Sequence, residues 1–290
     1  MNAQEYLNTI KDIHQNILAF IENEEDNECN MSDLTFLFDN EEIKKDHKTV
    51  FNLIVNIANN HHRNSDFFNK IEQILQLLKD DIKKLPNIEI FNIFKSNKKI
   101  LLYLLQTNKL LIDQYVLTRL KKEKFCYYFF PEIKMFLNSD EIDSISKEIP
   151  ENFVEKRQVS ENDSYLCELI RNDSINEFIS YINKENIPLS GTYIKKSIFE
   201  LNSLINKKQT TLIEYAAFFG SIQIFKFLLL NKAELKPSLW KYAIHGKNSS
   251  IIHILEENNV VPKDNSYIKC FIESIKCHHN DIANYIRDNY

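Results

Sequence analysis

The amino-acid sequence predicts an all-α fold, in which an N-terminal helical region precedes a solenoid of helix-turn-helix repeats. Apolar residues recur at spacings of three and four, the period of a helix, and few segments alternate as a β-strand does. Related helix-sized segments recur along the second half of the chain, as they do in repeat proteins. Hydrophobic residues make up 43% of the 290 residues, which is enough to bury a large core.

The N-terminal region, residues 1–150, opens with a predicted helix over residues 3–21, whose apolar residues fall on one stripe. The acidic run over residues 22–28 is interpreted as a solvated loop. A stronger helix is expected to begin at Ser65, a good N-cap, and to end or restart at Pro86. Further helices are expected over residues 47–59, 110–120 and 129–137.

The C-terminal half contains a motif that recurs. The segment TLIEYAAFFGSIQIFKFLLL, residues 211–230, holds an Ala-Ala pair small enough for close helix packing. Gly220 follows, where a left-handed conformation would end the helix. Ser238 matches Thr211 at an offset of 27 residues, Phe271 matches Trp240 at an offset of 31, and Leu166 matches Leu212 at an offset of 46. These offsets define repeats over residues 164–187, 211–235, 238–261 and 266–290.

Three other segments complete the predicted organisation. Residues 87–110 repeat the two-helix rhythm and are interpreted as a degenerate unit. Residues 187–210 form an insertion between the first two repeats. Pro150 and the polar run over residues 155–163 mark the expected boundary between the two halves.

The segment from Thr211 to Leu230 resembles the ankyrin-repeat pattern T-P-L-H-x-A-A-x-x-G-x-x-x-I-V-x-L-L-L. With irregular spacings, shortened fingers and a helical region in front, the chain resembles ankyrin-repeat proteins of the DUF3447 type, which are expanded in parasitic protists. The runs NNHHRNSDFF and EIFNIFKSNKKILLYLL extend this resemblance to the N-terminal half. The resemblance implies a scaffold without enzymatic activity, cofactor or defined ligand.

One departure from the ankyrin pattern concerns the histidine that precedes the apolar pair of the inner helix. The residues at the corresponding positions are Glu168, Glu214, Lys241 and Ile272. The usual loop network is therefore in doubt. Glu214 and Lys241 are expected to form an ion pair between neighbouring repeats, contributing about 0 to 1 kcal/mol if exposed.

Potential metal ligands occur in two places. Cys270, Cys277, His278 and His279 are ligand types that zinc takes, but three adjacent residues cannot easily all reach one ion. We expect a solvated turn between helices there. His61 and His62, between two predicted helices, are not expected to bind a metal either.

No catalytic residue or cofactor site is predicted. Cys126 lies in an aromatic run and Cys167 on an inner helix, where a cysteine usually acts as a small hydrophobe. Neither is linked to a histidine by a known motif. With only three glycines, the chain has no loop of the kind that surrounds a phosphate.

Charge and compartment follow from composition. A net charge of -5 gives no long-range attraction to nucleic acid. Lys121, Lys122 and Lys124 precede an aromatic run, residues 125–130, that is expected to be core rather than a base-stacking platform. No signal peptide or apolar span is evident, so no membrane is expected. Five cysteines, an odd number, favour free thiols and the cytoplasm, with the nucleus open.

These observations favour a non-enzymatic scaffold that binds an unidentified protein partner through a concave face, formed by inner helices and the loops before them. No small-molecule substrate is expected. The candidate contact residues are Phe218, Trp240, Lys241, His245 and Lys247. The alternative is a two-surface adaptor or effector, whose N-terminal helical half recruits a second component.

Overall fold

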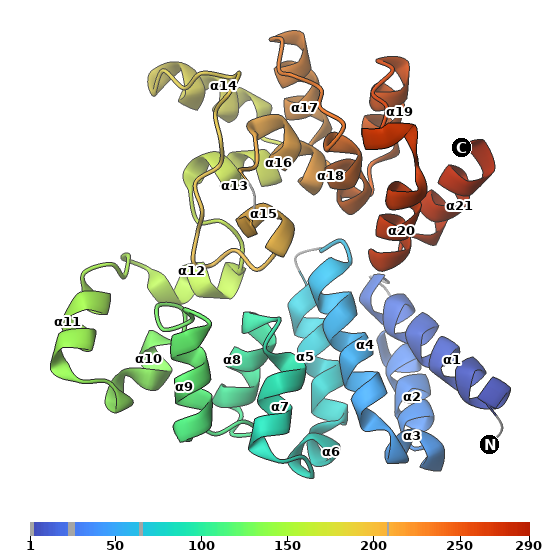
Figure 1. The fold of residues 1–290 in the computed structure, drawn as a ribbon, viewed down its shortest axis with the longest axis vertical. Coiled ribbons are helices and arrows are strands. Elements are labelled where there is room, and N and C mark those ends of the chain that lie inside the picture. The colour runs from blue at the N-terminus through green and yellow to red at the C-terminus, as the bar shows by residue number, and fades with distance from the viewer. Residues whose placement is uncertain (1–2, 23–26, 64–65, 208) are drawn as a thin grey trace. The chain divides into compact units, whose positions relative to one another are not determined.

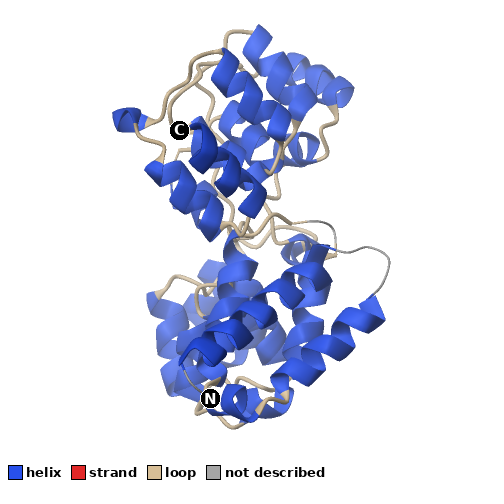
Figure 2. Ribbon diagram, turned by 90° about the vertical axis from the view of Figure 1, so that its right-hand side faces the viewer, coloured by secondary structure: helices blue, strands red, loops and turns tan. Residues whose placement is uncertain are grey.

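The structure, a computed structural model, describes residues 3–22, 27–63, 66–207 and 209–290, and only the backbone of residues 27–30, 207 and 264. The described residues form α-helices and two short 3-10 helices joined by loops, with no strand (Figure 2). One isolated antiparallel bridge joins Tyr193 to Thr211. The all-α prediction is therefore confirmed. None of the described helices is both long enough and apolar enough to cross a membrane.

The chain divides into two compact units. Unit 1 contains residues up to Asn59 together with Arg63–Glu151, and unit 2 contains Asn60–His62 and Asn152–Tyr290. The polar run over residues 155–163 is not all loop, because α12 covers its first half.

Unit 1 is built from helices of uneven length. They are α1 (Ala3–Glu22), α2 (Asn27–Phe38), α3 (Glu41–Lys45), α4 (His47–Asn60), α5 (Phe67–Leu77), α6 (Lys79–Lys83), α7 (Asn87–Phe94), α8 (Lys98–Gln106), α9 (Gln114–Lys122), α10 (Phe130–Ile133), η1 (Lys134–Phe136) and α11 (Ser139–Ser146). The predicted stripe of α1 is buried at Ile13, Ile17 and Phe20. The loop predicted over residues 22–28 is wrong at both ends, because Glu22 ends α1 and residues 27–28 begin α2. Residues 23–26 and the N-cap position Ser65 lie outside the described residues.

Within unit 1, α7 and α8 contact each other as the degenerate repeat predicts. Asn97 caps α8 by accepting a hydrogen bond from the backbone N–H of Ile100 at 3.1 Å. Three helices of this unit, α2, α3 and α11, were not predicted, because short segments with a weak apolar stripe leave little periodic signal.

Unit 2 contains four consecutive helix pairs. Its helices are α12 (Phe153–Val159), α13 (Tyr165–Arg171), α14 (Ile175–Lys184), α15 (Ser203–Lys207), α16 (Leu212–Phe219), α17 (Ile222–Leu230), α18 (Leu239–Gly246), α19 (Ser249–Glu257), η2 (Lys263–Asn265), α20 (Ile268–Lys276) and α21 (Asn280–Asn289). The first pair is α13 and α14, the second α16 and α17, the third α18 and α19, and the fourth α20 and α21. Figure 1 shows the pairs side by side, with the inner helices α13, α16, α18 and α20 in contact in that order.

The turn inside each pair has the same backbone geometry. Asp173, Gly220, Lys247 and His278 occupy the left-handed region, with φ angles of 48°, 69°, 51° and 61°. Gly220 therefore ends its helix as predicted. Asp173 lies 47 residues before Gly220, so the predicted offset of 46 for the first pair is wrong by one residue. Because this turn residue is an aspartate and not a glycine, the sequence does not mark the turn, and the alignment of the first pair is shifted by one residue.

Hydrogen bonds from side chains join successive pairs at these turns. Ser221 donates from Oγ to Ile170 O at 2.5 Å. Asn248 donates from Nδ2 to Gly220 O at 2.8 Å. His279 Nδ1 lies 2.9 Å from Ile244 O, which fixes Nδ1 as the protonated nitrogen. In the second, third and fourth pairs, the residue that follows the left-handed position thus satisfies a carbonyl group at the end of the preceding inner helix.

The contact between the second and third pairs is the closest in this unit. A Cβ atom placed on Gly246 would lie 2.1 Å from Ala217 O and 2.9 Å from Gly220 N. Ala216 and Ala217 are fully buried on the facing helix. Only glycine at position 246 allows these two helices to approach so closely.

Candidate functional site

A groove of about 780 Å³ lies between the segments that precede α18 and α20. Each segment contains a proline. Pro237 lies in the turn that leads into α18, closed by a hydrogen bond from the backbone N–H of Leu239 to Lys236 O, and Pro262 has an extended backbone directly before η2. The lining residues come from these segments and from the first turns of the two helices. They are Lys236, Pro237, Ser238, Trp240, Lys241, Pro262, Lys263, Ser266, Lys269, Cys270, Ile272 and Glu273.

The floor of the groove is apolar. Trp240 is only 1% exposed and donates a hydrogen bond from Nε1 to Val260 O, so its ring is fixed. Ile272 is 57% exposed. With Ile268 and Ile275, also exposed, it forms an apolar stripe along α20 at spacings of four and three. An exposed apolar stripe on a surface helix indicates a contact surface for another molecule.

The rim of the groove is basic. Lys236, Lys241, Lys263 and Lys269 line it, and among the lining side chains that the structure describes Glu273 is the only acid. Lys236 pairs with the exposed Glu234 at 3.2 Å, a contact that contributes little in water. Lys241 also pairs with Glu273, but four lysines against this one acid among the described lining residues give the rim a net positive charge.

Glu273, at the base of the groove, is held by three cationic or donor groups. Its Oε1 lies 2.8 Å from His245 Nε2 and 3.5 Å from Lys276 Nζ, and its Oε2 lies 3.1 Å from Lys241 Nζ. Burial would raise the pKa of Glu273, but the hydrogen bonds and charges of His245 and Lys241 outweigh it and lower the pKa to about 2. Glu273 is therefore ionised at neutral pH.

His245 is neutral at the same pH. Burial lowers its pKa, and the hydrogen bond that His245 donates to Glu273 opposes that shift without overcoming it. A neutral imidazole donating from Nε2 leaves Nδ1 without a proton.

The predicted contact residues are only partly brought together. Lys241 lines the groove, and Trp240 lies beneath it, where a side chain that is 1% exposed offers a partner hardly any surface. Phe218 and His245 are buried and stack on each other, with ring centroids 5.1 Å apart, so they offer no exposed contact surface. Lys247 is exposed but occupies the left-handed turn of the third pair, away from the residues that line the groove.

The predicted ion pair between Glu214 and Lys241 is not formed, because each has another partner. Glu214 closes a capping box with Thr211 and accepts a hydrogen bond from Ser238 Oγ at 2.6 Å. Lys241 pairs with Glu273 instead. The link between the second and third pairs is thus a hydrogen bond from a hydroxyl group to a carboxylate.

The expected solvated turn at Cys277, His278 and His279 is wrong. Cys277 and His279 are fully buried, because this turn packs against the end of α18. Burial lowers the pKa of His279 to about 3 and raises that of Cys270 to about 11. The pKa of Cys277 is raised further still, also by burial.

The remaining cysteines and the basic run match their structural interpretations. Burial raises the pKa of Cys167 to about 11 and also raises that of Cys126, so neither is a thiolate at neutral pH. Lys121 pairs with Glu141 at 2.6 Å. The aromatic residues Tyr128, Phe129 and Phe130 are buried core.

Sequence reasoning missed three of the rim lysines, Lys236, Lys263 and Lys269. The available signal was the position of Lys236 and Lys263 beside Pro237 and Pro262, in the segments that precede the inner helices of the third and fourth repeats, and the position of Lys269 at the start of α20. Comparison with protein-family models, with curated proteins and with solved structures finds no match for this chain.

Proposed function

We propose that unit 2 is a non-enzymatic, ankyrin-type binding module, and that the groove between its third and fourth helix pairs holds an acidic, partly apolar segment of a protein partner. The observation that carries this proposal is the combination of an apolar floor with a lysine rim. An apolar anchor of the partner would be desolvated on the floor, while its carboxylates would meet the lysines.

The ankyrin assignment is supported by local features of unit 2. Four helix pairs share the left-handed turn, and the second pair begins with a capping box at Thr211. The groove involves the segments before two inner helices, the side on which ankyrin arrays would present a binding face. The DUF3447-type resemblance is part of the same proposal.

A binding role rather than catalysis is favoured by the state of the titratable groups. A reactive cysteine needs a lowered pKa and access to solvent, whereas Cys277, near His245, is fully buried with a raised pKa. Glu273 is held by His245 and two lysines, which suits an ion-pair network. The four cysteines of the described side chains are free thiols, which supports a reducing compartment such as the cytoplasm.

Selection of random peptides against the whole protein tests the proposal. We expect the selected peptides to combine acidic residues with one or two apolar anchors, and their affinity to fall with added salt. The double variant Lys263→Glu/Lys269→Glu should lose at least tenfold in affinity. The matched control, Lys184→Glu/Lys226→Glu, reverses two exposed lysines on the outer helices α14 and α17 and should bind as the parent does.

Neutral or basic selected peptides, or equal losses in the two double variants, would contradict the proposal. A single-stranded oligonucleotide serves as a further probe. We expect no competition from it, because Trp240 is buried and offers no face on which a base could stack.

The division of the chain into two compact units favours a second candidate, a two-surface adaptor. Unit 1 has its own exposed apolar side chains, Phe36 at 80% and Met135 at 84%. A protein captured from cell extract equally by the parent and by Lys263→Glu/Lys269→Glu would bind elsewhere than the groove and would support the adaptor.

A further inference from the structure

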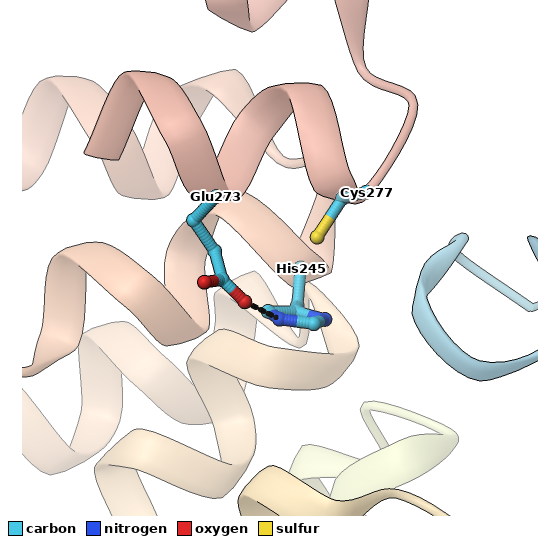
Figure 3. A group of neighbouring side chains, drawn as sticks. All are labelled: His245, Glu273 and Cys277. Carbon is cyan, nitrogen blue, oxygen red and sulfur yellow. Dashed lines mark hydrogen bonds and ion pairs between the residues drawn. The ribbon is translucent and has the colours of Figure 1, made fainter. Parts of the chain in front are cut away.

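Three donor side chains converge beneath the groove. His245, Glu273 and Cys277 place one ligand atom each within 4.8 Å of one another (Figure 3). His245 comes from the last turn of α18 and Glu273 from α20, and Cys277, four residues after Glu273, is the C-cap residue of α20. All three residues are buried, so the contact between the two inner helices holds the donors together.

All three donor types coordinate zinc in proteins. Imidazole nitrogen, carboxylate oxygen and thiolate sulfur bind zinc at about 2.0 to 2.3 Å in a tetrahedron, which places ligand atoms roughly 3 to 4 Å apart. The pair His245 Nε2 and Glu273 Oε1, at 2.8 Å, is already closer than that. In a three-ligand arrangement of His245, Glu273 and Cys277, the fourth position of the tetrahedron would be left for water.

Space and access exist on one side of the cluster. A cavity of about 160 Å³ lies there, and its lining includes His245 and Glu273. Asn202, Ser203, Lys241 and Lys276 are polar or cationic residues of the same lining. The cavity is large enough to hold a zinc-bound water, and polar enough to hydrogen-bond it. Lys241, 3.1 Å from the second carboxylate oxygen of Glu273, would keep that carboxylate oriented while the first oxygen binds the ion.

From this geometry we propose that His245, Glu273 and Cys277 form a site for a single zinc ion, which ties the third helix pair to the fourth. The site differs from the cluster that the sequence suggested, because His279 uses Nδ1 to bind Ile244 O and Cys270 lines the groove. In the proposed site the thiol gives up its proton to solvent when the ion binds. The ion replaces the hydrogen bond between His245 and Glu273.

Titration of the chelator-treated whole protein tests the site. We expect one equivalent of zinc to bind, and cobalt in its place to give a thiolate-to-metal absorption band. Cys277→Ser should abolish the band and weaken zinc binding at least tenfold. Cys270→Ser is the matched control, since it removes a buried thiol of the neighbouring turn, and it should retain both.

Two outcomes would contradict the proposed zinc site: the parent binds no stoichiometric zinc, or the parent and Cys277→Ser bind zinc with equal affinity. Circular dichroism of both metal-free variants serves as the control for folding, and we expect both to keep the helical signal of the parent. If Cys277→Ser does not fold, His245→Gln provides a second removal of one ligand with the thiol in place, and it should also lose at least tenfold in zinc affinity. Unchanged zinc binding in Lys263→Glu/Lys269→Glu separates this site from the proposed peptide groove.

Discussion

The second and third helix pairs meet through their backbones, whereas the third and fourth meet through charged side chains. At the first contact, Gly246 approaches Ala217 so closely that a methyl group has no room. At the second, Lys241 and His245 of α18 reach across to Glu273 of α20. The groove opens at the second contact.

This difference shows that two contacts between helix pairs with the same type of turn can have different roles, one in close packing and the other in forming a groove. Small residues allow close helix packing and leave no surface for another molecule. Long polar side chains hold the helices further apart, and the space between the preceding loops becomes a groove. Trp240, the sole tryptophan, lies beside the second contact, so its fluorescence reports the unfolding of unit 2 alone.

The largest expected effect is at the backbone contact. Gly246→Ala places a methyl group against Ala217 O, and relief requires the two helices to move apart. We expect a loss of about 3 kcal/mol in the free energy of unfolding, measured by urea titration of Trp240 fluorescence. Gly191→Ala, where nothing lies within 4 Å of the new atom but φ is +79°, should cost about 1 kcal/mol. Equal costs would mean that the helices do not approach as described.

Acid should weaken the charged contact. The pKa of Glu273 is about 2 in the folded protein, against an ordinary value of 4.5. The ionised carboxylate therefore stabilises the fold in full when the pH is above 4.5, and this stabilisation is lost as the pH falls toward 2. The contribution is on the order of 2 to 3 kcal/mol. Unfolding free energies measured from pH 6 to 3 should therefore fall more steeply for the parent than for Glu273→Gln. Parallel curves would show that Glu273 titrates normally.

A smaller effect is expected at the hydrogen bond that joins the turn of the fourth pair to α18. His279→Ala leaves Ile244 O without its side-chain donor in a buried place, at a cost of about 1 to 2 kcal/mol. His279→Asn should recover part of the loss, because Asn248 makes the corresponding bond in the third pair. Thermal unfolding of both variants provides the comparison, and an asparagine variant no better than alanine would argue against a common turn geometry.

Much of the fold could be predicted from the sequence, because apolar periodicity and the glycine turn at Gly220 carry a strong signal. Helices α1, α4 and α16 to α21 lie where the pattern placed them. The register of the first pair was wrong because Asp173 adopts a conformation that the sequence marks only when glycine is present. Short helices such as α11 and α15 carry too few turns to show a period.

The candidate site could be predicted less well. Lys241 and Trp240 were selected, but Phe218 and His245 are buried, since only the packing of neighbouring pairs determines which side of an inner helix remains open. His279 looked like a solvated turn residue because its acceptor, Ile244 O, lies 35 residues away along the chain. The ligand set His245, Glu273 and Cys277 joins two helices, so no local spacing could indicate it.

The most direct test of the account measures stability and peptide binding on Lys263→Glu/Lys269→Glu. Both lysines line the groove. We expect the free energy of unfolding, measured by urea titration, to stay within about 0.5 kcal/mol of that of the parent, as for ordinary surface substitutions. The affinity for a selected acidic peptide should fall at least tenfold. An unchanged affinity in a fully folded variant would contradict the claim that the lysine rim of the groove carries the binding function.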